Sequence, residues 1–251
     1  MLLAGKVAVI SGAANPRGIG FATARLFAAH GAKVAILDLD ETASQDAASG
    51  LDGPEHRGFA CNVVEPAACK EAGRRVLEVY GQVDVLINNA GITQPVKTMD
   101  ITPEDFRRIL AVNLDGVLYL SQAFIPHMRE RKRGSIACMS SVSAQRGGGV
   151  FGGPHYSAAK AGVLGLAKAM ARELGPDGIR VNCVTPGLIQ TDITGGKLTD
   201  EMRRDILKGI PLNRLGNADE VAGVYLFLAS DLSSYVTGAV IDVNGGMLIH
   251  G

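Results

Sequence analysis

The stretch KVAVISGAANPRGIG, residues 6–20, joins an apolar run to a glycine-rich turn. A short, continuously apolar run is typical of a strand that is buried on both faces of a sheet. The glycines Gly12, Gly18 and Gly20 follow it, but they do not have the G-x-G-x-x-G spacing of the common dinucleotide fingerprint. The stretch is therefore either a phosphate-binding loop before a helix or a glycine-rich turn without a ligand.

Similar β-branched runs recur along the chain, and longer segments rich in Ala, Leu, Arg and Glu separate them. These runs occupy residues 6–10, 33–37, 58–63, 83–88, 134–141, 179–187 and 239–246. Apolar strands that alternate with amphipathic helices predict an α/β fold, a doubly wound parallel sheet of the Rossmann type with helices on both faces. We expect a single domain over residues 1–251, with the polar excursion 191–213 as a lid or substrate loop.

Composition narrows the classes of partner. The chain has 251 residues, and 25 Lys and Arg balance 25 Asp and Glu, so no net field attracts nucleic acid or an anionic membrane. Its first residues lack the pattern of an export signal, and no uninterrupted apolar run reaches the roughly 20 residues of a membrane span. These features predict a cytoplasmic protein that binds small molecules and copies of itself.

The four cysteines are Cys61, Cys69, Cys138 and Cys183, and no two of them form a C-x-x-C pair. At least three of them lie in strand-like runs. We expect buried, reduced thiols rather than a disulfide or a metal site.

A ligand of a doubly wound sheet binds beyond the carboxyl ends of the strands. After the first run, backbone N–H groups and the positive end of a helix that begins near Ile19 would face an anion. Asp38 ends the second run, where a carboxylate can accept hydrogen bonds from an adenosine ribose and repel a 2′-phosphate. Asp38 thus favours NAD over NADP, unless it is a surface turn residue. Arg17 would favour NADP, because a guanidinium can pair with that phosphate.

The ends of the third and fourth runs are polar or small. Asn62 and Val63 end the third run, where Asn62 could hydrogen-bond an adenine edge or simply end the strand. Asn89 and Gly91 belong to the NNAG segment, which could lie against a ribose or brace the sheet. We include all four among the predicted cofactor contacts.

The acid–base chemistry is predicted from Tyr156 and Lys160, in YSAAK. Residues four apart share one face of a helix, so the ammonium group would lie near the phenol. A nearby positive charge should lower the pKa of the tyrosine from its usual value of about 10 and make it an acid or base near neutral pH. A Tyr-x-x-x-Lys pair alone is weak support, but here it follows a strand that ends in Ser140 and Ser141.

Together, SGAANPRGIG, Asp38, NNAG, Ser141, YSAAK, IRVNCVTPG and DVNGG resemble the short-chain dehydrogenase/reductase family of the Tyr-x-x-x-Lys type. The resemblance keeps the order of the motifs and covers nearly the whole chain. In that family the glycine loop is T-G-x-x-x-G-x-G and binds the pyrophosphate. Here Ser11 replaces the threonine, and two extra residues lie between Gly12 and Gly18.

The resemblance implies a role for each matching residue. Tyr156 would exchange the proton, Lys160 would modulate its pKa and bind the nicotinamide ribose, and Asn113 would hold a water in a proton relay. Ser141 would donate a hydrogen bond to the substrate oxygen, although the family's usual spacing would select Ser143. We prefer Ser141 because it ends the strand, and we assign the extra length to RGGGVFGG. The segment expected to orient the nicotinamide carboxamide contains Pro186, Gly187, Ile189 and Thr191.

These expectations predict an NAD-dependent oxidoreductase that moves a hydride between nicotinamide and a secondary alcohol or ketone, with no metal required. Candidate substrate contacts are Gln94, Arg146, His155 and Gln190, each of which could instead be a solvated loop residue. Polar walls of this kind would suit a sugar, a polyol or a hydroxy acid.

Two other functions remain open. One is an NADPH-dependent 3-oxoacyl thioester reductase of the same fold, and the other is a non-catalytic dinucleotide-sensing protein. The resemblance also implies a homotetramer that pairs through segments 102–130 and 156–175. The apolar tail MLIHG would then pack near the pocket of a neighbouring subunit.

Overall fold

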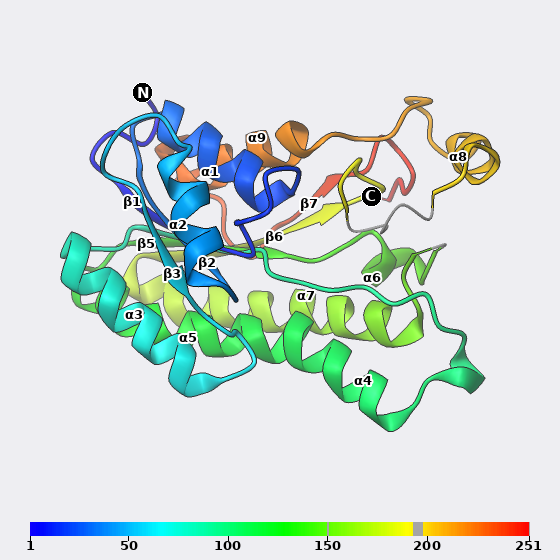
Figure 1. Cartoon of the computed structure of the whole chain (residues 1–251), viewed down its shortest axis with the longest axis horizontal. Coiled ribbons are helices and arrows are strands. Elements are labelled where there is room, and N and C mark those ends of the chain that lie inside the picture. Colours follow the sequence, from blue (N-terminus) through cyan, green and yellow to red (C-terminus); the bar gives the residue numbers. More distant parts are fainter. Residues whose placement is uncertain (150, 193–197, 251) are drawn as a thin grey trace.

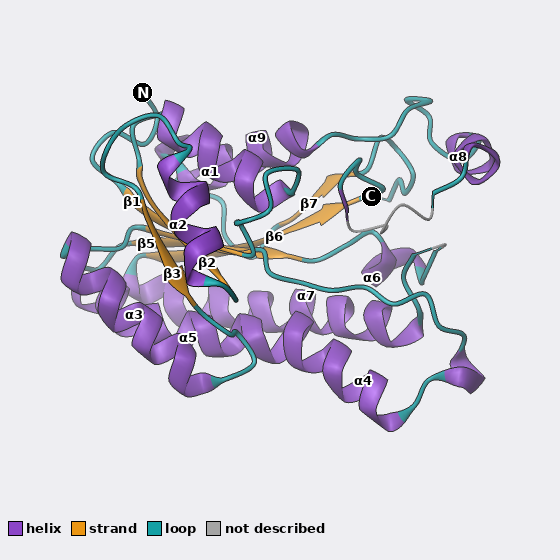
Figure 2. Ribbon diagram, in the orientation of Figure 1, coloured by secondary structure: helices purple, strands orange, loops and turns teal. Residues whose placement is uncertain are grey.

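The structure, a computed structural model, describes residues 1–149, 151–192 and 198–250. Its centre is a seven-stranded parallel sheet in the order β3-β2-β1-β4-β5-β6-β7 (Figures 1 and 2). The strands are β1 (Val7–Ser11), β2 (Lys33–Asp38), β3 (Arg57–Ala60), β4 (Val85–Asn88), β5 (Gly134–Met139), β6 (Ile179–Pro186) and β7 (Val240–Val243). The predicted α/β fold with one doubly wound sheet is confirmed.

Helices cover both faces of this sheet (Figure 1). On one face lie α3 (Pro66–Tyr80), α5 (Gly116–Glu130) and α7 (Pro154–Leu174), and on the other α1 (Ile19–Ala29), α2 (Glu41–Ser49) and α9 (Ala218–Ala229). Alternation along β1 explains the two layers, because successive side chains of a strand point to opposite faces. Val7 and Val9 pack into the core under α3, α5 and α7, whereas Ala8 and Ile10 pack into the core under α1 and α9.

The strand order reverses between β1 and β4. Val9 pairs with Ala35 of β2 on one side and with Leu86 of β4 on the other. The chain thus builds β1 to β3 outward in one direction and β4 to β7 outward in the other. The chain leaves β1 and β4 toward opposite sides of the sheet, which opens a crevice for a ligand at the carboxyl ends of these two strands.

A long helical run joins α4 (Pro103–Leu110), the π-helical turn η2 (Ala111–Asp115) and α5. By length and mean hydropathy alone, the helix Pro103–Glu130 could cross a membrane. The sequence showed no uninterrupted apolar run there, because polar residues are interspersed along this helix. Here its apolar side chains Val117, Leu120 and Phe124 are buried against the sheet. That burial is what a core helix requires.

The expected lid, residues 191–213, is partly helical. It contains α8 (Asp200–Leu207), whose first turn is capped by the Thr199 side chain accepting from Met202 N at 3.2 Å. Residues 193–197 of the expected lid lie outside the described part of the chain.

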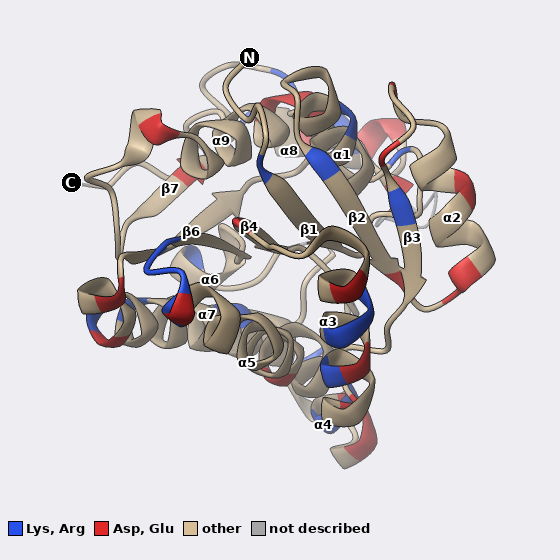
Figure 3. Ribbon diagram, turned by 90° about the vertical axis from the view of Figure 1, so that its left-hand side faces the viewer, with Lys and Arg blue, Asp and Glu red and all other residues tan. Residues whose placement is uncertain are grey.

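The cysteines are buried as predicted, and most charged residues lie on the surface (Figure 3). The four thiols are buried and unpaired. Charged residues lie mainly on the outward surfaces of the helices and at strand ends, with both signs interspersed (Figure 3). Short helical turns complete the described elements: η1 (Thr98–Asp100), α6 (Ser143–Arg146), η3 (Gly175–Asp177) and η5 (Asp231–Ser233).

Candidate active site

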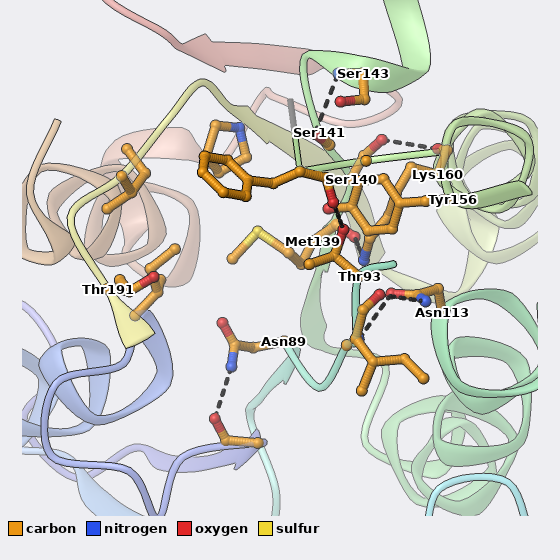
Figure 4. A pocket seen from close by; sticks show the side chains of 18 of the residues that line it. Asn89, Thr93, Asn113, Met139, Ser140, Ser141, Ser143, Tyr156, Lys160 and Thr191 are labelled. Carbon is orange, nitrogen blue, oxygen red and sulfur yellow. Dashed lines mark hydrogen bonds between the residues drawn. The ribbon is translucent and has the colours of Figure 1, made fainter. Parts of the chain in front are cut away.

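A cavity of about 700 Å³ lies at the carboxyl ends of the strands. The loops after β1, β2, β4, β5 and β6 line it, so residues distant in sequence meet there (Figure 4). The lining includes the predicted cofactor residues Gly12, Gly18, Ile19, Asp38, Asn62, Val63, Asn89, Gly91, Tyr156, Lys160, Pro186, Ile189 and Thr191. Arg17 and Gly20 are not part of this wall, and their positions are described below.

The glycine loop presents the N-terminus of α1 to the cavity. Gly18 is the N-cap residue and lines the cavity with Ile19. No described side chain caps this helix end, and its first turn holds no acidic residue. Its N–H groups and positive dipole end are therefore free to bind an anion. A dinucleotide pyrophosphate fits these requirements.

Glycine is required at two positions of this loop because the loop packs directly on its neighbours. Gly12 has φ +64°, and a Cβ there would lie 2.7 Å from the Cα of Ala90. A Cβ on Gly20 would lie 2.5 Å from the Gly12 carbonyl oxygen. Gly20 therefore does not line the cavity, but its lack of a side chain lets α1 pack closely against the Gly12 backbone.

Ser11 and Asn89 tie this loop to β4. The Ser11 hydroxyl accepts hydrogen bonds from the backbone N–H groups of Asn89 and Ala90, both at 3.1 Å. The Asn89 amide donates to the carbonyls of Ser11 and Gly12, both at 2.9 Å. Asn89 thus braces the loop while it lines the cavity. The sequence analysis assigned no role to the Ser11 hydroxyl, which joins two strand ends here.

Asp38 lies at the end of β2 and faces the same cavity. Its Oδ2 accepts from Ala14 N at 3.0 Å and its Oδ1 from Leu39 N at 2.9 Å. A carboxylate can accept about four hydrogen bonds, so two remain for the hydroxyls of an adenosine ribose. Asn62 lines the cavity nearby, but its amide donates to Glu65 Oε1 at 2.8 Å and is already engaged in the turn before α3.

Arg17 is paired with Asp192 rather than with Asp38. Its guanidinium forms a two-point ion pair with Asp192, at 2.8 Å from Nε to Oδ2 and 2.7 Å from Nη2 to Oδ1. Asp192 follows β6 and lines the cavity. The glycine loop is thereby connected to the segment after β6.

Tyr156 and Lys160 lie on the first turns of α7, which begins at Pro154, a residue well suited to the first position of a helix. Lys160 is only 2 % exposed. Its Nζ donates to the Met139 carbonyl at 2.9 Å and lies 5.9 Å from the centroid of the Tyr156 ring. The predicted proximity of amine and phenol is present inside the cavity wall.

The predicted effect of Lys160 on the pKa of Tyr156 is not found. Burial raises the pKa of Tyr156, and the Ser141 hydroxyl, rather than Lys160, opposes that shift. Burial also lowers the pKa of Lys160 to about 8. The physical reason is desolvation, which disfavours phenolate and ammonium alike when both are enclosed.

Ser141 and Ser143 both line the cavity, but they differ in their contacts. Ser141 is buried two residues after β5 ends at Met139, and not in the strand as predicted. Its Oγ accepts from Ser143 N at 3.1 Å. That bond leaves the Ser141 O–H free to donate. Ser141 also acts on the phenol of Tyr156, so the contacts favour it over Ser143. The extra length of RGGGVFGG follows α6, and its residue 150 lies outside the described chain.

Asn113 lies in η2, a π-helical turn of the kind that often marks a functional site. Its amide donates to the carbonyls of Ile92 and Ile109, both at 2.9 Å, and its Oδ1 accepts from Ile92 N at 3.3 Å. A Cβ on Gly91 would lie 2.8 Å from Asn113 Oδ1 and 3.3 Å from Lys160 Nζ. Gly91 therefore leaves the space in which these two polar atoms approach each other.

The end of β6 reaches the cavity through Pro186, and the segment after it through Gly187, Leu188, Ile189 and Thr191. A Cβ on Gly187 would lie 2.9 Å from the Cα of Asn244, so only glycine fits there. Gln190, a predicted substrate contact, does not line the cavity, and its backbone N–H pairs with Gly216 O at 2.9 Å.

Of the other predicted substrate contacts, Arg146 lines the cavity, whereas Gln94 and His155 do not. The Gln94 amide donates to Asp105 Oδ1 at 2.7 Å, so its oxygen faces His155 Nε2 at 2.9 Å. His155 is buried and joins α7 to the loop after β4. The local sequence gave no signal of this pairing, because its partners are 61 residues apart.

The cavity also has an apolar wall that the sequence analysis missed. Its members are Met139, Phe151, Leu188, Ile206 and Met247. Met247 belongs to the tail that was expected to cover a neighbouring subunit. In this chain the tail lies against its own cavity, where His250 Nε2 is 3.0 Å from both Asp242 Oδ2 and Gln145 Nε2.

Comparisons with known proteins agree with this geometry. The family model described as enoyl-(acyl carrier protein) reductase matches residues 12–248. The chain is 70% identical, over the full length of both, to the uncharacterized short-chain type dehydrogenase/reductase y4mP of Sinorhizobium fredii. It is 44% identical to the 3-oxoacyl-[acyl-carrier-protein] reductase FabG of Thermotoga maritima, over 99% of this chain and all of that protein.

A solved structure gives the same result in three dimensions. The crystal structure of gox2181 superposes with a TM-score of 0.93 at 35% identity, over 98% of this chain and 96% of that one. Sequence similarity along the whole chain and the shared fold lead to one conclusion: this protein belongs to the short-chain dehydrogenase/reductase family.

Proposed function

We propose that this oxidoreductase uses NAD to interconvert a secondary alcohol and a ketone on a polar, anionic substrate, with Tyr156 as the acid and base. One observation carries the proposal: a single cavity holds an acidic ribose site at Asp38, an uncapped helix N-terminus, and the cluster of Ser141, Tyr156 and Lys160. This order matches the order of adenosine, pyrophosphate and nicotinamide in a dinucleotide.

The bound nicotinamide would supply the hydride acceptor or donor. In the oxidation direction, deprotonated Tyr156 takes the hydroxyl proton while the carbinol carbon loses its hydrogen and the bonding pair as a hydride, and the C–O bond becomes C=O. The Ser141 O–H holds the reacting oxygen in place. Reduction uses the same groups in reverse, with Tyr156 donating its proton.

Lys160 and Asn113 support this proton transfer. One of the three Lys160 N–H donors binds the Met139 carbonyl, which leaves two for the hydroxyls of a nicotinamide ribose. Asn113 Oδ1 accepts one hydrogen bond from Ile92 and can accept a second from a water beside Lys160. Such a water would continue the path of the proton away from Tyr156.

Asp38 supports the choice of NAD. A 2′-phosphate placed beside its carboxylate would meet like-charge repulsion in a partly buried pocket. Replacing Asp38 with Asn should therefore weaken NAD binding and narrow the preference for NAD over NADP. Dissociation constants for both dinucleotides, measured by calorimetry, test this step.

Arg146 supports an anionic substrate. It lines the cavity five residues after Ser141, and the described chain offers its guanidinium no hydrogen-bond or ion-pair partner. The acidic wall residues Asp192 and Asp205 are paired with Arg17 and Lys208. A carboxylate on the substrate would find its partner in Arg146.

The decisive experiment is a substrate panel with the purified protein. Hydroxy acids, polyols, sugars and apolar secondary alcohols are offered with NAD and with NADP, and the reduced cofactor is followed by its absorbance. We expect NAD-dependent turnover that is fastest with hydroxy acids. Turnover of apolar alcohols alone contradicts the substrate class, and dinucleotide binding without any turnover would favour a non-catalytic sensor.

A second function has its own support. The FabG relative is a 3-oxoacyl-[acyl-carrier-protein] reductase by name, and the apolar wall of Met139, Phe151, Leu188 and Ile206 would suit an acyl chain. This function predicts NADPH-dependent reduction of a 3-oxoacyl thioester. Michaelis constants for NADH and NADPH with such a thioester distinguish it from the first proposal.

We further propose a homotetramer that pairs through α4, α5 and α7. Phe106 on α4 is 43% exposed. In the most apolar 18-residue stretch of Pro103–Glu130, only 39% is buried within this chain. A second copy would cover that surface. Light scattering coupled to size exclusion should give four times the mass of 26.2 kDa, and the mass of one chain would contradict the proposal.

A further inference from the structure

The contact between Arg17 and Asp192 joins two loops that are far apart in sequence. Asn15 adds a third bond to the two-point ion pair, since its Nδ2 donates to Asp192 Oδ2 at 3.2 Å. Asn15 and Asp192 both line the cavity. Among the described residues, the Asp192 carboxylate therefore accepts bonds from both of these loop side chains.

The glycine loop is shaped to direct Arg17 toward Asp192. Arg17 N donates to Asn15 Oδ1 at 3.0 Å, and Gly18 N donates to Asn15 O at 2.9 Å. Pro16 lies inside this turn and fixes its own backbone φ. The two residues by which this loop exceeds the family pattern lie between Gly12 and Gly18, so they fall in the part of the loop that makes the contact.

The same loop also holds Asp38. Ala14 N donates to Asp38 Oδ2, and Arg17 follows three residues later. Arg17 is thus the one Lys or Arg in residues 11–20, and it comes three residues after the backbone N–H that binds Asp38. If its guanidinium were released from Asp192, it could turn to a phosphate on the ribose 2′ position.

We propose that Asp192 is a specificity-determining residue, which holds Arg17 away from the ribose and so weakens the binding of NADP relative to NAD. The inference rests on the proposed dinucleotide site, but it does not depend on which cofactor the natural enzyme prefers. Side chains in the pair are 78% and 38% exposed, so the contact is weak and Arg17 can leave it. Only molecules in which Arg17 is released from Asp192 can use it to bind NADP. The apparent NADP affinity therefore equals the affinity of the released form multiplied by the fraction of molecules in that form.

The test is Asp192→Asn, with dissociation constants for NAD and NADP measured by calorimetry. The amide keeps the size of the side chain but releases the guanidinium. We expect the ratio of the NAD to the NADP dissociation constant to rise about three- to fivefold. Loss of one negative charge should strengthen the binding of both dinucleotides, so the ratio, not either constant alone, is the readout.

The matched control is Asp205→Asn. Asp205 also lines the cavity and also forms an ion pair, with Lys208 at 2.7 Å, but it does not hold Arg17. Its ratio of dissociation constants should stay at the wild-type value. In the double variant Arg17→Gln/Asp192→Asn the rise should disappear, because no guanidinium remains to be released.

The outcomes separate the inference from the proposed function. An unchanged ratio in Asp192→Asn, an equal rise in Asp205→Asn, or a rise that survives in the double variant would each overturn the role of Asp192. Failure of the wild-type protein to bind either dinucleotide would instead overturn the proposed site. Circular dichroism of each variant confirms that these exposed substitutions leave the fold in place.

Discussion

The Lys160 ammonium lies 5.9 Å from the centre of the Tyr156 ring, and it donates its hydrogen bond to the Met139 carbonyl rather than to the phenol oxygen. The amine is therefore fixed to the end of β5, with the aromatic ring beside it. A bound ribose that accepted the remaining N–H donors would link the two groups. Lys160 thus lies beside the Tyr156 ring without a direct bond to its oxygen.

Replacing Tyr156 with Phe should lower kcat by about 10²- to 10⁴-fold, because the acid–base group is lost. The ring remains, so the dissociation constant of NAD should hardly change. Steady-state kinetics and calorimetry measure the two quantities. The matched control is Tyr225→Phe, which removes a buried hydroxyl 3.5 Å from Met139 Sδ that does not line the cavity, and which should keep wild-type kcat. Equal losses in both variants would contradict the role of Tyr156.

Lys160→Met should change how stability depends on pH. Burial lowers the pKa of Lys160 from 10.5 to about 8, so between these values the unfolded chain binds more protons than the folded one. Wild-type stability must therefore rise with pH across this window, by about 3 kcal/mol from this group. Lys160→Met lacks this gain.

Urea unfolding of the wild type and of Lys160→Met, at several pH values from 7.5 to 10.5, measures this rise in stability. The difference in unfolding free energy, Lys160→Met minus wild type, should be constant near the lower end and fall toward the upper end. Other titrating groups cancel in that difference. A difference independent of pH would mean that the amine is solvated in the folded protein.

Ser141→Ala and Ser143→Ala should separate the two candidate serines. Ser141 has a free O–H donor beside Tyr156, so its removal should reduce kcat about 100-fold, the usual effect of losing one hydrogen bond to a reacting oxygen. Ser143→Ala should keep kcat within about threefold, since its backbone N–H still binds Ser141 Oγ. The opposite result would move the role to Ser143 and restore the family's usual spacing.

Local patterns predicted the fold and the residues that line one cavity, because both depend on periodicity and strand ends. Seven apolar runs became seven strands, and the residues after them line one cavity. Contacts between distant side chains could not be predicted in this way. The pair Arg17 and Asp192 spans 175 residues, and the pair Gln94 and His155 spans 61.

The spacing of Tyr156 and Lys160 had a similar limit. A separation of four residues places two side chains on the same helix face, but it does not fix where the longer one ends. The Met139 carbonyl determines that, and it comes from a separate element, the strand β5. Burial, which reverses the expected pKa shift of Tyr156, is likewise a property of the assembled cavity.

Gln94→Leu should destabilise the fold and leave the substrate KM unchanged. The Gln94 oxygen accepts from His155 Nε2, which is buried, so its loss leaves that N–H without a partner. The cost should be about 1 to 3 kcal/mol in urea unfolding. In Gln94→Leu/His155→Leu both polar partners are gone, and most of the stability should return. A raised KM in a fully stable Gln94→Leu would instead place Gln94 at the substrate.

Arg146→Gln tests the anionic substrate class. The substitution should raise KM for a hydroxy acid about three- to tenfold, with a smaller change in kcat, because Arg146 binds the carboxylate away from the reacting carbon. The expected rise in KM is modest because Arg146 is exposed, and water and salt screen its interaction with the substrate carboxylate. For the same reason, the wild-type KM for the hydroxy acid should rise with ionic strength.

The control is the neutral amide of the same hydroxy acid. Its KM should be higher than that of the acid with the wild-type enzyme, and Arg146→Gln should leave it unchanged, since no charge pairs with the guanidinium. Arg146→Lys should recover only part of the affinity for the acid, because an ammonium cannot make two parallel hydrogen bonds to a carboxylate. If Arg146→Gln raises KM for the acid and the amide equally, then Arg146 shapes the cavity and does not recognise charge.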